Sequence, residues 1–216
     1  MTDYLDEPDA QSLLPTRQSL LSRLRDGQDQ AGWREFFDTY WRLIYNVARK
    51  SGLNDAEAQD VVQNTFLYLT RRMPRFQYDK TRGSFKSWLR VVTRSRVHAF
   101  LRAEKAHSEL VREPLAGEIS DDAEIPASQL EPVGDSWDQL WQHEWEQNLV
   151  GTAFRRLRAK VSAQQLLIFR LTTVGQLPLI QVAKKLGVSL PQVYLARHRV
   201  GKLFKAEVLR LRSQTE

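Results

Sequence analysis

Residues 179–205 read LIQVAKKLGVSLPQVYLARHRVGKLFK, and this stretch decides the fold of the C-terminal part of the chain. Two short helical patterns flank Gly187, which can supply the positive φ of a tight turn. Ser189 begins the second helix, and Gln192 completes a capping box three residues later. Ala183 is small where the two helices would cross. Apolar residues would fill the space between them: Val182, Leu186, Val188 and Val193. The stretch predicts a helix-turn-helix.

In this motif the second helix lies in the major groove of DNA. Its predicted inward face holds Val193, Ala196 or the stem of Arg197, Val200 and Phe204. The outward face would then hold Gln192, Tyr194, Leu195, His198 and Arg199. Gln can read adenine and Arg can read guanine. Phosphate contacts are expected from Lys184, Arg197, Lys202 and Lys205.

The charge of the chain is distributed in three blocks. Residues 1–102 carry 17 Lys and Arg against 12 Asp and Glu, whereas residues 103–150 carry 2 against 12. Residues 151–216 carry 13 against 2. Two basic modules joined by an acidic segment suggest a protein that binds a polyanion at two separate sites. The sequence pI near 9.7 makes nucleic acid the leading class of partner.

Composition also excludes several classes of protein. The chain has no cysteine, so a disulfide framework and a thiolate site are excluded. No run approaches the ~20 apolar residues that span a bilayer, and the acidic N-terminus is the reverse of a signal peptide. We therefore expect a cytoplasmic protein with no membrane contact, no cofactor and no metal.

The N-terminal module is expected to be a helical bundle. Aromatic and aliphatic residues from Trp33 to Ala48 recur at three- and four-residue steps and predict a helix that ends near Gly52. Asn54 and Glu57 form a capping box for a second helix, which Pro74 ends. A third helix is predicted from Ser84 or Phe85 to Arg102. The aromatic faces of the first two helices are interpreted as core.

The third helix carries a stripe of basic residues. Lys86, Arg90, Arg94, His98 and Arg102 recur at four-residue intervals, and residues 80–103 contain no acid. Solvated helix faces usually mix charges, because like charges at i,i+4 cost a few tenths of a kcal/mol each. The stripe therefore indicates contact with an external polyanion rather than a plain solvated face.

The loop before this helix has the composition of a single-stranded DNA site. Aromatic residues that can stack on bases alternate with cations that can hold the backbone. The relevant residues are Phe76, Tyr78, Lys80, Arg82, Phe85, Lys86 and Trp88, with Gly83 among them. Phe85 and Trp88 are also compatible with ordinary core positions.

One face of the second helix is polar and weakly acidic. Asp60, Gln63, Asn64 and Leu67 share it at i, i+3, i+4 and i+7. Such a face on a basic module is not suited to DNA, so it is either plain solvent surface or a protein-docking surface.

The acidic segment between the modules is predicted to be a flexible, extended linker, because prolines, glycines and acids dominate it. Trp137, Trp141 and Trp145 then begin a helix, and we expect them to pack in the core of the second module or at its edge. Ser162 and Gln165 cap the next helix.

Taken together, these motifs resemble the extracytoplasmic-function (ECF) group of sigma factors in the sigma-70 family. The resemblance rests on DAEAQDVVQNTF at 55–66, on the aromatic stretch from Phe76 to Leu89, and on QVAKKLGVS at 181–189 with Val193 and Tyr194. It implies an all-α fold of two small helical domains, a region 2 bundle and a region 4 helix-turn-helix, joined by the acidic flexible linker. The expected divisions are an acidic tail at 1–15, region 2 at 16–103, the linker at 104–140 and region 4 at 141–216.

The resemblance also implies partners and site residues. The clamp of core RNA polymerase would be bound by Asp60, Gln63, Asn64 and Leu67. The flap of the polymerase would be a further contact of the chain. The −10 element would be melted and held by Phe76, Tyr78, Lys80, Arg82, Lys86, Arg90, Arg94 and His98. The −35 duplex would be read by Gln192, Tyr194, Leu195, Arg197, His198, Arg199 and Lys202. An anti-sigma factor is a further expected partner.

The sequence departs from the family's pattern at Ser95 and His98, where Asn and Asp are usual, and at Pro191-Gln192 in the last helix. These departures concern which DNA sequence is read. Two alternatives remain. A stand-alone helix-turn-helix regulator would explain the C-terminal module but would not need the aromatic basic loop. An enzyme acting on nucleic acid lacks support, because the four His are scattered and residues 80–103 contain no carboxylate.

Overall fold

The computed structural model describes residues 18–75, 84–109 and 135–213, and these ranges form helices without strands. The elements are α1 Gln18–Arg23, α2 Gln30–Lys50, α3 Asp55–Arg72, the short 3₁₀ helix η1 Met73–Arg75, α4 Phe85–Glu109, α5 Asp135–Leu157, α6 Ala163–Thr173, α7 Leu179–Leu186 and α8 Leu190–Ser213. The predicted all-α fold is confirmed. The short helix α1 was not predicted.

The predicted helix ends are set by local chemistry. Both sides of the capping box between Asn54 and Glu57 are formed, as are those between Ser162 and Gln165. Gly187 ends α7 with φ of 64°. The third predicted helix is longer than expected, because α4 continues past Arg102 to Glu109 into residues assigned to the linker. Good helix formers (Ala, Glu and Lys) fill five of these seven extra positions, and no Gly or Pro interrupts them.

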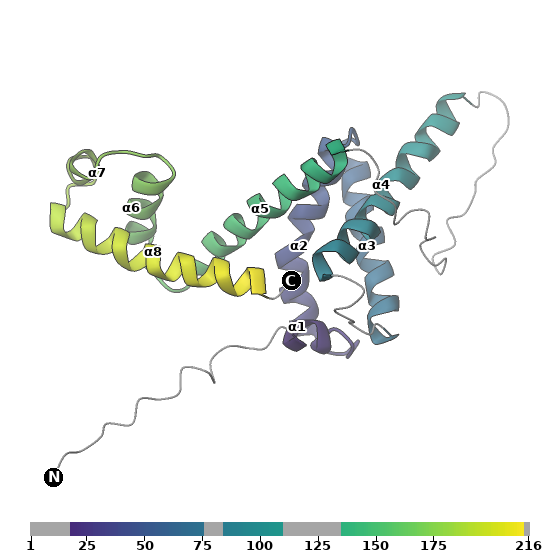
Figure 1. Cartoon of the computed structure of the whole chain (residues 1–216), viewed down its shortest axis with the longest axis horizontal. Coiled ribbons are helices and arrows are strands. Elements are labelled where there is room, and N and C mark those ends of the chain that lie inside the picture. Colours follow the sequence, from purple (N-terminus) through teal and green to yellow (C-terminus); the bar gives the residue numbers. More distant parts are fainter. Residues whose placement is uncertain (1–17, 76–83, 110–134, 214–216) are drawn as a thin grey trace, which may run out of the picture.

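The first bundle consists of α2, α3 and α4, with α1 at one end of α2 (Figure 1). Its core is built from α2 residues Phe36, Leu43 and Val47, which meet Leu69 of α3 and Leu89 of α4. All five side chains have essentially no exposed surface. Burying each contributes roughly 1.5–3 kcal/mol relative to exposure. The aromatic periodicity of α2 therefore does produce a core along one side of the helix.

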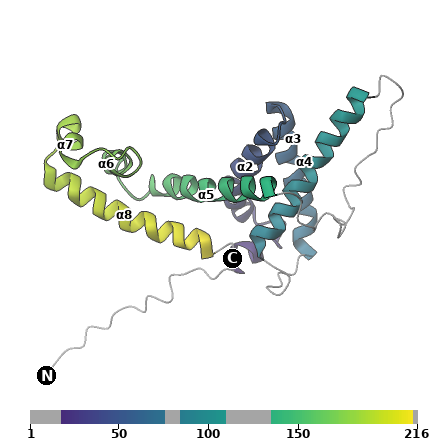
Figure 2. The same cartoon turned by 45° about the horizontal axis from the view of Figure 1, so that its top comes forward.

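The C-terminal bundle packs α6 and α7 against the N-terminal half of α8, and α5 runs beside α8 (Figure 2). One small core joins Ile168, Val182, Ala183, Val193 and Ala196. A second core joins Leu157 of α5 to Phe169 and Val200. The wedge predicted for the helix-turn-helix is thus formed, and α5 belongs in part to this bundle.

The prediction for the tryptophans of α5 is wrong. Trp141 and Trp145 are 2% and 3% exposed, and they pack in the core of the first bundle rather than that of the second. Trp145 stacks on Tyr40 of α2 with ring centroids 5.9 Å apart. The physical reason is that the apolar surface of α2 is too wide for α3 and α4 alone, and α5 covers the remainder. Helix α5 therefore joins the two bundles.

Candidate protein-docking groove and nucleic-acid interface

An apolar groove of about 700 Å³ lies between α2 and α3. Its lining residues are Phe37, Trp41, Tyr45, Gln59, Val62, Gln63, Phe66, Leu67 and Thr70. Phe37 is the centre of its aromatic wall, with its ring centroid 4.8 Å from that of Phe66 and 6.2 Å from that of Trp41. Exposed apolar surface with polar surroundings is typical of a protein-interaction site.

Two of the four docking residues predicted from the sequence line this groove, and the other two lie on the same helix beside it. Gln63 and Leu67 line it, and the side chain of Leu67 is 50% exposed. Asp60 is exposed and Asn64 is half-buried on the same helix, but neither lines the groove. The four residues therefore form one surface: an apolar hollow with a polar, weakly acidic margin.

The aromatic wall of the groove was missed, because periodicity assigned all the aromatic residues of α2 to the core. Phe37 is instead 42% exposed and Trp41 is half-buried. The guanidinium of Arg42 lies 4.3 Å from the Trp41 ring, a cation–π contact on the solvent side. The available signal was that the apolar residues of α2 cover more of its circumference than one core stripe requires.

The basic stripe of α4 forms as a continuous row on one helix face, but most of it is half-buried. Lys86, Arg90, Arg94 and His98 are intermediate in exposure, and only Arg102 is exposed. Burial lowers the pKa of His98, and the neighbouring Arg94 and Arg102 lower it further. The lowered pKa favours the neutral imidazole, so His98 adds little positive charge to the stripe.

The expectation that the stripe lacks a countercharge is wrong, because α5 supplies one. Arg90 donates to Asp138 at 2.8 Å, and Lys86 donates to the side-chain oxygen of Gln142. The ammonium of Lys86 also lies 5.5 Å from the ring of Trp145. Residues 80–103 hold no acid, so this compensation arises only in three dimensions. Of the predicted −10 residues, Phe76, Tyr78, Lys80 and Arg82 lie outside the described residues.

The outward face predicted for α8 is confirmed as a surface. Val193, Ala196 and Val200 are buried. The side chains of Gln192, Tyr194, Leu195, Arg197, His198, Arg199 and Lys202 are exposed. The Gln192 side-chain oxygen accepts from the Ser189 backbone N–H at 3.0 Å, so Gln192 caps the helix as predicted. Its amide NH₂ remains the group able to contact a base.

We expect Gly201→Ala to stabilise the chain by ~1 kcal/mol, because Gly in a helix interior is less favourable than Ala by that amount. A Cβ at position 201 would lie 3.5 Å from Phe169, an ordinary van der Waals distance, so close packing does not require glycine there. Urea unfolding of both proteins measures the difference. A destabilised alanine variant would contradict this assignment.

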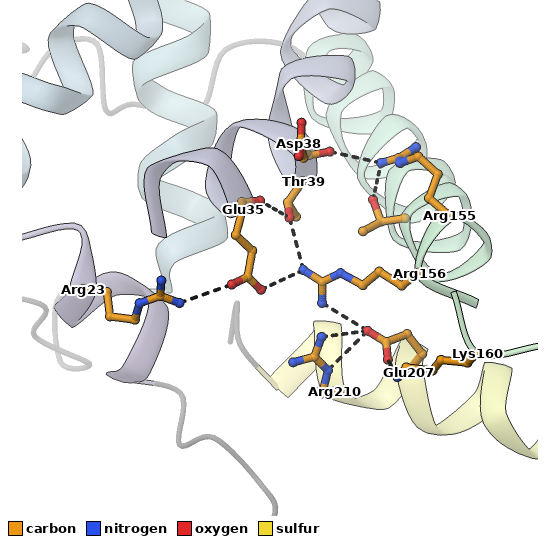
Figure 3. Close-up of polar contacts among 10 residues, drawn as sticks. Arg23, Glu35, Asp38, Thr39, Arg155, Arg156, Lys160, Glu207 and Arg210 are labelled. Atoms are coloured by element: carbon orange, nitrogen blue, oxygen red, sulfur yellow. Dashed lines mark hydrogen bonds and ion pairs between the residues drawn. The ribbon is translucent and has the colours of Figure 1, made fainter. Parts of the chain in front are cut away.

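A network of ion pairs joins α1, α2, α5 and α8 (Figure 3). Arg156 of α5 is its centre, bonding Glu35 of α2 and Glu207 of α8, each at 3.1 Å. Glu207 is 3% exposed and also accepts from Lys160 at 3.0 Å and Arg210 at 2.9 Å. Burial opposes ionisation of the Glu207 carboxyl, but hydrogen bonds from Arg210, Lys160 and Arg156 outweigh it and lower its pKa to about 2. A signal for this network was present in the sequence, since Glu207 is the one acid between residues 151 and 215.

The part of the chain that the structure describes shows neither a metal site nor a membrane-spanning helix. No group of three or more His, Asp or Glu side chains there could hold a metal ion. None of the described helices is long and apolar enough to cross a bilayer.

Comparison with known proteins finds a family match for part of the chain. Residues 36–107 match the family model for sigma-70 region 2. No curated protein sequence matches the chain. Among solved structures, CnrH in complex with the cytosolic domain of CnrY is 16% identical, and the alignment covers 88% of this chain and 94% of that chain with a TM-score of 0.32. That score is too low to carry an argument.

The matched residues run from the first turns of α2 almost to the end of α4. They therefore comprise the bundle that carries both the apolar groove and the basic stripe. The similarity to sigma-70 region 2 therefore covers this bundle.

Proposed function

We propose that this chain is a sigma factor of the ECF group that directs promoter recognition by core RNA polymerase. The observation that carries the proposal is the sigma-70 region 2 match over α2–α4, where the structure holds an apolar docking groove and a row of cations. A protein-docking surface and a polyanion-binding surface on one small domain fit a factor that joins polymerase to DNA.

In this proposal the groove and its polar margin bind the clamp of core polymerase. Phe37, Trp41 and Leu67 would be the anchors, since aromatic and apolar side chains in desolvated pockets dominate interface energies. Asp60, Gln63 and Asn64 would contribute the polar contacts at the margin.

The stripe of α4 would hold the single-stranded −10 element once it is melted. Cations track the phosphate backbone, and stacking on rings captures each unpaired base with about 1–3 kcal/mol. Unpairing a base costs a similar amount, so the reaction needs no nucleotide hydrolysis by this chain. Phe76, Tyr78, Lys80 and Arg82 are assigned to this step from the sequence.

The C-terminal bundle would read the −35 element with the exposed face of α8. Support comes from the helix-turn-helix itself and from three cations that line one hollow with Tyr194 and His198: Arg197, Lys202 and Lys205. Arg199 is exposed on the same helix. Arg199 is assigned to base readout and Lys202 to a phosphate. Contact with the polymerase flap and control by an anti-sigma factor remain expectations of the same proposal.

In vitro transcription tests this function. The chain and core polymerase are mixed with a library of random promoter sequences, and the transcribed templates are sequenced. We expect enrichment of two short elements separated by a fixed spacing, with core polymerase alone as the control. Transcription no higher than that of core alone would contradict the proposal.

The second candidate is a stand-alone helix-turn-helix regulator, which the exposed basic face of α8 favours on its own. Selection of random duplexes by the free chain, without polymerase, separates the two functions. A regulator would bind a specific duplex tightly by itself, with a single element enriched. A sigma factor needs core polymerase for the two-element selection.

A further inference from the structure

We propose that α5 is an intramolecular cover for the DNA-binding face of α4, so that the unbound chain is autoinhibited and must release α5 before it can hold single-stranded DNA. The inference rests on the proposed function, because it takes the stripe of α4 to be a DNA site. The contacts between α4 and α5 exist whatever the function of the stripe.

The N-terminal half of α5 occupies the stripe directly. Asp138 pairs with Arg90 at 2.8 Å, and Gln142 accepts from Lys86. Trp137 places its ring centroid 5.9 Å from that of His98. These three residues of α5 therefore contact three of the five stripe positions, Lys86, Arg90 and His98. A carboxylate and an amide oxygen take the place that phosphate oxygens would take on bound DNA.

Helix α5 is anchored on the first bundle by buried groups. Glu144 is 2% exposed and pairs with Lys50 at the end of α2. Asn148 is 8% exposed and donates to the Thr39 carbonyl at 2.9 Å. Both are polar groups whose burial is tolerated only because α2 supplies their partners. The arrangement is therefore a specific docked state rather than a loose association.

The C-terminal bundle strengthens the same docked state. Arg156 pairs with Glu35 of the first bundle and also with Glu207 of the C-terminal bundle (Figure 3). The network of ion pairs therefore connects the two bundles. Leu211 of α8 is buried in the cluster that contains Trp141 and Trp145. The helix-turn-helix is thereby held against the first bundle together with α5.

Two features make release of α5 feasible. The indole N–H groups of Trp137 and Trp141 are buried without a hydrogen-bond partner among the described residues. Each such group costs about 1–3 kcal/mol, which offsets part of the packing energy of the interface. In addition, residues 110–134 connect α4 to α5, and a segment of this length can span ~80 Å when extended.

The cover leaves the docking groove accessible, because the described residues that line the groove all belong to α2 and α3. The closed chain can therefore contact polymerase while its DNA face is occupied. The order of events follows from this geometry: docking first, then release of α5, then capture of single-stranded DNA.

The test uses Lys50→Glu, which sets a carboxylate against the buried Glu144. Binding of the full chain to a fluorescein-labelled single-stranded DNA of mixed sequence is measured by anisotropy at fixed salt without polymerase. We expect at least about tenfold tighter binding, because a site open in a small fraction of molecules has its affinity reduced by that fraction. The gain would occur although the substitution lowers the net charge by two, which by itself weakens nucleic-acid binding.

Arg25→Glu is the matched control, since it makes the same charge change at an exposed position after α1. It should bind the DNA no more tightly than wild type. The double variant Lys50→Glu/Glu144→Lys restores an ion pair of reversed polarity and should return binding to the weak wild-type value. Small-angle scattering should show a larger radius of gyration for Lys50→Glu alone.

A Lys50→Glu chain that expands in scattering but gains no affinity for the DNA overturns the inference. So does one that neither expands nor gains. If the variant does not fold, Asn148→Asp sets a carboxylate against the Thr39 carbonyl and is measured with Gln147→Glu as its control. The transcription assay on the wild-type chain is read separately, so failure of the cover and failure of the sigma function are distinguishable.

Discussion

Glu207→Ala should reduce the free energy of unfolding by about 3 kcal/mol, the low end of the cost of breaking a buried ion pair. The substitution leaves Arg156, Lys160 and Arg210 without their shared acceptor. The cost stays at the low end because the Lys160 side chain is 53% exposed and can be rehydrated. Urea unfolding followed by tryptophan fluorescence measures the loss.

Glu146→Ala is the matched control, because Glu146 pairs with Arg212 at 2.9 Å but is 43% exposed. Exposed pairs contribute about 0–1 kcal/mol, so this variant should unfold nearly as wild type does. Equal losses from the two substitutions would show that the Glu207 network does not hold the bundles together.

The same carboxyl predicts how stability depends on pH. Its pKa is about 2 in the folded chain against an ordinary 4.5, so its contribution is fully present above pH 4.5 and is lost as pH falls through about 2. The gap between these values corresponds to ~3 kcal/mol. In the Glu207→Gln variant the free energy of unfolding should therefore fall less steeply as the pH drops below 4.5. The same steepness in the variant and the wild type would argue against the lowered pKa of Glu207.

Local features of the fold could be predicted because their causes lie within a few residues. The capping boxes that begin at Asn54 and Ser162 each need partners three residues apart, and both are formed. Gly187 has the positive φ that a tight turn requires. The buried positions of α8 followed from a helical period applied over one helix. In each case the sequence contains all the interacting groups close together.

Features that depend on distant segments could not be predicted. A helical period shows that Trp141 and Trp145 share an apolar face, but it does not show which bundle covers that face. The same limit explains why Phe37 was taken as core and why Arg90 was thought to lack a countercharge. Its partner Asp138 is 48 residues away in the chain. The docking surface was predicted by its polar margin, whereas its aromatic wall comes from another helix.

That aromatic wall leads to the other large expected effect. Phe37→Ala combined with Leu67→Ala should weaken binding to core RNA polymerase by about 3 kcal/mol, which corresponds to a dissociation constant more than 100-fold higher. The two side chains are 42% and 50% exposed in the free chain, so their removal leaves the core of the first bundle intact. Biolayer interferometry with immobilised core polymerase measures the change, and thermal unfolding verifies that the variant is folded.

Leu209→Ala serves as the control for this variant, because Leu209 is 55% exposed on α8, away from the groove. It removes the same kind of exposed apolar surface and should leave the affinity for polymerase unchanged. The comparison decides what the groove contributes. If nonspecific hydrophobic contacts of exposed leucines were responsible for binding to polymerase, both variants would weaken that binding equally. Wild-type affinity in the double variant would instead assign docking to the polar margin of Asp60, Gln63 and Asn64, with the hollow beside it a passive feature of the bundle.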